Sequence, residues 1–197
     1  LDVKKYKLKA TVATAIIIDN SGSMAVEVAP GIQKIHLANE ACCRTIELMN
    51  DQDYVCVIYS ESSPKPAIPM TKLTDRAHIY DRIKRMQSEG GGIWLKPQLD
   101  VAYDALKKVS AAIRHVLVFA DADDVDDAYQ LDIEDYIRLK RREGITLTTV
   151  GMGQATDKDA KWLEQIADAG GGRFFITDDV RKLPQIFTED IMVATKR

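Results

Sequence analysis

The sequence contains a short run of oxygen-bearing side chains whose spacing is typical of a cation-binding turn. Asp19, Ser21 and Ser23 occupy alternate positions directly after a run of β-branched residues. Asp121 ends a second hydrophobic run much later in the chain. Hard divalent cations such as Mg²⁺ take oxygen ligands and readily keep waters in their shell. The pattern therefore indicates an oxygen-rich point, provided that the fold brings the two segments together.

The elements that must position these residues alternate between buried-strand and amphipathic-helix patterns. Residues 11–19 are continuously apolar and β-branched, as expected for a strand covered on both faces. In residues 32–49, by contrast, apolar side chains recur with helical spacing. Further strands are predicted at residues 54–59, 115–119, 145–150 and 173–176. Further helices are predicted at residues 75–86, 97–109, 126–142, 157–169 and 180–194.

This alternation predicts a doubly wound, Rossmann-like α/β fold, in which a mostly parallel central sheet carries helices on both faces. The prolines at positions 64, 66 and 69 favour an edge strand or a loop, since proline cannot donate to a central ladder. In such a sheet, ligands bind at the carboxyl ends of the strands. Asp19 and Asp121 are both expected at that edge.

Composition limits the classes of function that remain. The chain has 197 residues, of which 46% are hydrophobic and 29% charged, and this favours one globular domain over residues 1–197. Its formal net charge of −3 argues against a nucleic-acid-binding protein, which usually has a strong basic excess. No apolar run approaches the length of a membrane span. Three cysteines without Cys-x-x-Cys spacing predict buried thiols rather than a zinc site.

The Asp19-x-Ser21-x-Ser23 motif, the three glycines before Ile93 and the strand-terminal Asp121 together resemble a von Willebrand factor type A domain. The resemblance extends over nearly the whole chain. In that family the pattern forms a metal-ion-dependent adhesion site, which holds Mg²⁺, or Mn²⁺ or Ca²⁺ in its place. The resemblance implies that Ser21 and Ser23 contact the ion directly, while the two aspartates often act through water.

Two departures from the family pattern predict a weakened metal site. The family usually has a threonine ligand after the glycines, and Ile93 stands at that position here. Isoleucine offers no oxygen, so the ion would depend on the Asp19 turn, Asp121 and waters. The residues on either side of Asp121 are alanines, where the family usually has Thr/Ser and Gly. Trp94 follows Ile93, and the sequence leaves open whether it is a core residue or a partner contact.

The resemblance implies a binding module rather than an enzyme. We expect it to recognise a protein partner, whose carboxylate would complete the coordination of the bound ion. Residues 178–187 also resemble the corresponding segment of type A domains in large bacterial membrane-associated proteins. The chain is therefore expected to be a piece of a larger parent protein, one that is anchored to a membrane. The sequence does not identify the partner or the compartment.

Two alternatives remain open from the sequence. One is a type A domain with a degenerate, metal-independent site that acts in structure or assembly. The other is a metal-dependent hydrolase, for which the Gly-x-Ser-x-Gly motif is missing. The three histidines, at positions 36, 78 and 115, are all predicted away from the carboxyl ends of the strands, where a general base would be needed.

Overall fold

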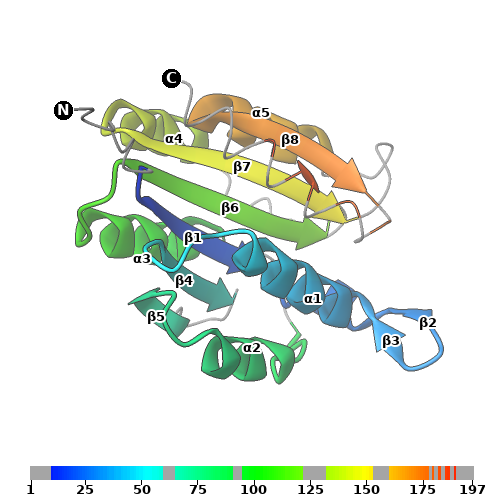
Figure 1. Ribbon diagram of the computed structural model, residues 1–197. Helices are drawn as coiled ribbons and strands as arrows, with labels where there is room; N and C mark the ends of the chain where they lie inside the picture. The colour runs from blue at the N-terminus through cyan, green and yellow to red at the C-terminus, as the bar shows by residue number, and fades with distance from the viewer. Residues whose placement is uncertain are drawn as a thin grey trace.

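A computed structural model describes residues 10–59, 65–90, 95–121, 132–152 and 160–177, together with residues 179, 182, 185, 186 and 189. Within these residues, six strands form one sheet in the order β5-β4-β1-β6-β7-β8 (Figure 1). The strands are β1 (Val12–Ile18), β4 (Tyr54–Tyr59), β5 (Pro66–Lys72), β6 (Ile113–Asp121), β7 (Ile145–Met152) and β8 (Gly171–Thr177).

All neighbouring strands in this sheet are parallel except β5, which pairs antiparallel with β4 at one edge. Pro66 and Pro69 both lie in β5, so the predicted edge placement of the proline-rich segment is confirmed. Proline is tolerated there because an edge strand needs only half of its backbone donors for the ladder. The predicted mostly parallel sheet is also confirmed.

Helices cover both faces of the sheet, as the doubly wound prediction requires. One face carries α1 (Lys34–Glu47) and α2 (Arg76–Lys84), and the other carries α3 (Leu95–Lys107), α4 (Ile133–Arg142) and α5 (Ala160–Gly170). Strand β1 serves both layers, since Ile17 packs in the core on the α3 side and Ile16 in the core on the α1 side. Its sequence, apolar except for Thr14, follows from burial on both faces.

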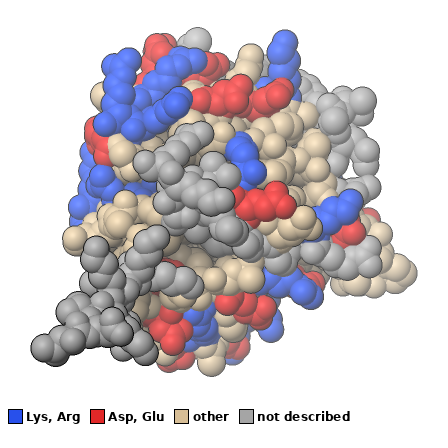
Figure 2. All heavy atoms as spheres, turned by 45° about the horizontal axis from the view of Figure 1, so that its top comes forward, with Lys and Arg blue, Asp and Glu red and all other residues tan. Residues whose placement is uncertain are grey.

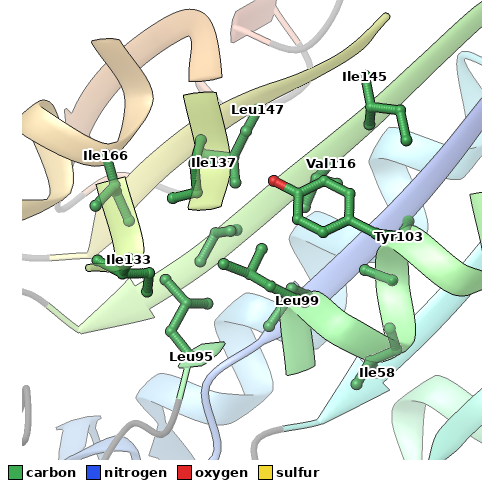
Figure 3. Packing of buried hydrophobic residues seen from close by; sticks show 14 of the residues in the cluster. Ile58, Leu95, Leu99, Tyr103, Val116, Ile133, Ile137, Ile145, Leu147 and Ile166 are labelled. Carbon is green, nitrogen blue, oxygen red and sulfur yellow. The ribbon is translucent and has the colours of Figure 1, made fainter. Parts of the chain in front are cut away.

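The core on the α3 side shows how the helices are fixed to the sheet. Leu99 and Tyr103 of α3 lie close to Ile137 of α4, over Val116 of β6 (Figure 3). These side chains are almost completely buried. The packing explains why apolar residues recur with helical spacing in both helices.

A small hairpin lies between β1 and α1, and the sequence did not predict it. Strands β2 (Glu27–Ala29) and β3 (Ile32–Gln33) are antiparallel and follow a short 3₁₀ helix, η1 (Gly22–Ala25). Gly31 makes the turn with a φ of 73°, a conformation that favours glycine. The predicted helical start at residue 32 is wrong, because Ile32 and Gln33 pair with β2 before α1 begins. Figure 1 shows the hairpin projecting beyond the start of α1.

The predicted helix over residues 126–142 is described only from residue 132 onward. Its described part, α4, begins at Ile133, and Asp132 before it has a φ of 66°. Residues 122–131 lie outside the described part of the chain. Most of the predicted closing helix at 180–194 also lies outside it. No helix among the described residues is long and apolar enough to cross a bilayer.

Charged side chains of both signs are interleaved on the surface shown in Figure 2. Several form ion pairs one helical turn apart, such as Arg44 with Glu40 and Arg138 with Glu134. In that view Lys and Arg side chains also gather at the upper left, next to acidic side chains.

Candidate metal site

Asp19 and Asp121 meet at the carboxyl ends of two neighbouring strands. Strands β1 and β6 pair in register up to Ile18 and Phe119. The Asp19 backbone N–H donates to the Phe119 carbonyl at 2.9 Å, and the Asp121 N–H donates to Asp19 Oδ2 at 3.2 Å. The chain passes from β1 to β4 on one side and later returns to β6 on the other, so the strand order reverses between β1 and β6. Ligands of doubly wound sheets bind at such a switch point.

The two serines lie directly beside this pair of carboxylates. The Ser21 backbone N–H donates to Asp19 Oδ1 at 2.8 Å, which folds the turn back toward the strand end. The hydroxyls of Ser21 and Ser23 lie 3.0 Å apart. Ser21 is buried and Ser23 half-buried. Hydrogen bonds therefore link all four predicted site residues at the ends of β1 and β6.

The segment after α2 holds the turn from the other side. Ser88 Oγ donates to the carbonyls of Ser21 and Asn20, at 2.6 and 3.1 Å, and the Glu89 N–H donates to the Asn20 carbonyl at 3.0 Å. A Cβ placed on Gly22 would lie 3.9 Å from the Cα of Gly90. The first glycine of the predicted loop therefore touches the turn. Residues 91–94, on which the predictions for Ile93 and Trp94 depend, lie outside the described residues.

Burial changes the electrostatics of the Asp19 carboxyl. Its side chain is only 2% exposed, and desolvation raises its pKa from 3.8 to about 6. Hydrogen bonds from Ser21 and Asp121 act in the opposite direction, and the nearby negative charge of Asp121 adds to the increase. Asp19 therefore carries its negative charge at neutral pH at a cost, and a bound cation would lower that cost.

A lysine that the sequence did not single out contacts the site. Lys34 Nζ lies 2.6 Å from Asp121 Oδ2, and Asp121 is almost fully buried. The other carboxylate oxygen, Asp121 Oδ1, is buried and has no hydrogen-bond partner in the described part of the chain. Both side-chain amide atoms of Asn20 are in the same condition. No sequence pattern marks Lys34, because it comes to Asp121 only through the hairpin.

The chemistry of these residues fits a hard divalent cation. Two carboxylates and two hydroxyls offer only oxygen, as Mg²⁺ prefers, and the unpartnered Asp121 Oδ1 is a ready acceptor. Among the described residues no three His, Cys, Asp or Glu side chains form a ready-made cluster. The set of metal donors therefore depends on the two serine hydroxyls as well as the two carboxylates. These residues offer no thiolate or imidazole, the ligands that softer metals prefer.

Comparisons with known proteins agree with this architecture. The von Willebrand factor type A domain family matches residues 15–189, and the chain belongs to that family. Over 198 residues the chain is 24% identical to the Escherichia coli (strain K12) protein YfbK, described as uncharacterized. That match covers 96% of this chain but only 32% of YfbK, so the chain spans about a third of that relative.

Two solved structures show the same fold. An aerotolerance-related membrane protein from Bacteroides fragilis has a TM-score of 0.77 and 15% identity, over 92% of this chain and 98% of the other. Proximal thread matrix protein 1 from the mussel byssus, solved with a zinc-occupied metal-ion-dependent adhesion site, has a TM-score of 0.75 and 17% identity. That match covers 94% of this chain and 46% of the mussel protein. The predicted family and its similarity to type A domains of bacterial membrane-associated proteins are therefore confirmed.

Proposed function

We propose that this domain is a protein-binding module that holds Mg²⁺ through Asp19, Ser21, Ser23 and Asp121. The ion would supply an open coordination position for a carboxylate of a partner protein. Such a position would join the two proteins, because neither protein alone completes the coordination shell of the cation. The partner's identity does not follow from these residues.

The observation that carries the proposal is the meeting of Asp19 and Asp121 across β1 and β6, with one Asp121 oxygen left without a partner. Buried carboxylates are costly unless they are paired or coordinate a metal. Support also comes from the mussel protein of the same fold, whose adhesion site holds zinc. A divalent cation is therefore the ligand that this arrangement suits best.

We propose a non-enzymatic role because the histidines have other surroundings. His36 Nδ1 accepts from the Gln33 N–H at the start of α1, and His78 is exposed on α2. His115 is buried within β6, with Nδ1 2.7 Å from the Thr146 hydroxyl. Phosphatase and esterase assays with Mg²⁺ test this directly. Turnover that disappears in Asp19→Ala would establish a hydrolase instead.

Calorimetric titration with Mg²⁺ and Mn²⁺ tests the metal site. We expect one site per chain in the wild type and none in Asp19→Ala. Asp81→Ala is the matched control, because Asp81 is an exposed carboxylate on α2 that pairs with Arg85. If the wild type does not bind metal at millimolar concentration, the proposal is wrong.

A second candidate function is a metal-independent type A domain that acts in structure or assembly. Two features favour it, the ion pair between Lys34 and Asp121 and the isoleucine at the family's threonine position. The substitution Ile93→Thr separates the two functions. Two results together would show that the natural domain no longer depends on metal. Ile93→Thr would bind metal much more tightly than the wild type, and Asp19→Ala would leave the wild type's behaviour unchanged.

A further inference from the structure

The ion pair between Lys34 and Asp121 differs from surface pairs such as Arg85 with Asp81. Asp121 is only 1% exposed and the Lys34 side chain 25%, and the two residues are 87 positions apart. Arg85 and Asp81, by contrast, are well exposed and one helical turn apart. Exposed pairs contribute little to stability, whereas a buried carboxylate that loses its partner is strongly destabilising. Lys34 is therefore the residue that neutralises Asp121 in this structure.

The position of Lys34 beside Asp121 is unfavourable for the helix that contains it. Lys34 is the first residue of α1, where a positive charge is disfavoured by the helix dipole. Its backbone N–H donates to the Val26 carbonyl at 3.1 Å, which fixes the start of the helix against the end of η1. The β2–β3 hairpin closes between these two residues. The hairpin therefore places Lys34 beside the site. At the start of a helix, this lysine would be unfavourable without Asp121.

An ammonium group and a divalent cation would compete for the same carboxylate, since Lys34 Nζ binds Asp121 Oδ2 and the metal would bind beside it. Lys34 Nζ donates to Asp121 Oδ2 at 2.6 Å, a short charge-assisted hydrogen bond. A metal ion beside Asp121 would place a second positive centre next to the ammonium, and like charges repel strongly where water is excluded. One of the two must leave.

We propose that Lys34 is a built-in counter-cation that excludes divalent metal from Asp121 and thereby sets the metal affinity of the site. This inference rests on the proposed metal site and specifies how that site is regulated. Metal entry requires the Lys34 side chain to swing away from Asp121 Oδ2, and loss of metal lets it return. The Asp121 carboxylate is therefore neutralised in either state, by the lysine in one and by the metal in the other.

Calorimetric titration of Mn²⁺ and Mg²⁺ into the wild type and Lys34→Met tests the proposal. Methionine keeps the length of the side chain and removes its charge. We expect Lys34→Met to bind metal about tenfold to a hundredfold more tightly, the range that corresponds to one charge-assisted hydrogen bond. Lys107→Met is the matched control: Lys107 also pairs with a carboxylate, at 2.8 Å from Glu143, but at the end of α3 that precedes β6. It should bind metal as the wild type does.

Thermal unfolding gives a second readout that does not depend on titration heats. In EDTA, Lys34→Met should melt below the wild type, because Asp121 is left buried and unpaired. Saturating Mn²⁺ should then raise its Tm by more than it raises that of the wild type. If the methionine variant does not fold, Lys34→Gln keeps a donor to Asp121 without the charge, and the same comparisons apply.

The outcomes separate this inference from the proposed function. Equal affinity in the wild type and Lys34→Met overturns the role of Lys34 and leaves the metal site standing. Binding by Lys34→Met alone supports the role of Lys34 and shows that the natural chain works without metal. Absence of binding in both variants overturns both proposals.

Discussion

The buried Asp19 carboxyl predicts a specific pH dependence of stability in the metal-free protein. Desolvation at the end of β1 raises its pKa from 3.8 to about 6. The folded state therefore holds the Asp19 proton more tightly than the unfolded state does. The resulting stability is fully present below the unfolded pKa and is lost as the pH rises through the folded pKa.

The size of this effect follows from the shift. About two pKa units correspond to about 3 kcal/mol, since each unit is worth about 1.4 kcal/mol. Most of that loss falls between about pH 4 and pH 6. Other groups titrate in the same window, so the contribution of Asp19 is isolated by subtracting the unfolding free energy of Asp19→Ala at each pH. The hydrogen bonds that alanine loses, from Ser21 and Asp121, favour the ionised carboxyl, and their effect is already contained in the net shift of the Asp19 pKa.

Urea denaturation in EDTA at several values from pH 4 to 7.5, followed by circular dichroism, measures the difference. We expect the wild type to lose roughly 2 to 3 kcal/mol relative to Asp19→Ala over this range. A difference that stays constant within about 1 kcal/mol, the value of less than one pKa unit, would refute the desolvation of Asp19. Repeating the series in saturating Mg²⁺ should reduce the loss if the cation binds the ionised carboxylate.

Three further outcomes follow from packing and burial. Gly172→Ala should destabilise the fold by about 3 kcal/mol in urea denaturation, because its Cβ would lie 2.1 Å from the Leu147 carbonyl oxygen in the neighbouring strand. Leu99→Ala should cost about 2–5 kcal/mol by the same measurement, since it empties a fully buried position under α3. Cys43 and Cys56 should resist iodoacetamide at pH 8 until the protein unfolds, as scored by intact-mass spectrometry, because burial raises their pKa to about 11 and about 12.

The parts of the fold that the sequence predicted well are those whose burial is uniform. Strand β4 coincides with the predicted 54–59, and β1 falls within 11–19, because double burial produces unbroken apolar runs. The hairpin was missed since its strands have only three and two residues, too few to show alternation. The predicted helix over residues 126–142 runs through Asp132, whose positive φ interrupts it, because acidic residues suit a helix N-terminus wherever the first turn begins.

The candidate site was predictable to the extent that topology determines it. Asp19 and Asp121 each end an apolar run, and a parallel sheet brings such ends to one edge. That β1 and β6 are immediate neighbours depends on strand order, which residue types do not encode locally. Lys34 was beyond sequence reasoning for the same reason. A lysine at a helix start is ordinary in sequence, and only the hairpin geometry places its ammonium 2.6 Å from a buried carboxylate.

The charges of the two aspartates are balanced within the chain by different means. The Asp121 backbone N–H donates to the Asp19 carboxylate, which holds the ends of β1 and β6 together and keeps the two residues side by side. The chain compensates for each of them differently. Asp19 has a raised pKa and hydrogen bonds from its own turn, while Asp121 is paired with Lys34. A divalent cation would serve both carboxylates at once, and it would release the lysine. At the proposed metal site, the affinity for metal would therefore depend on the cost of displacing Lys34 as well as on the oxygen ligands themselves.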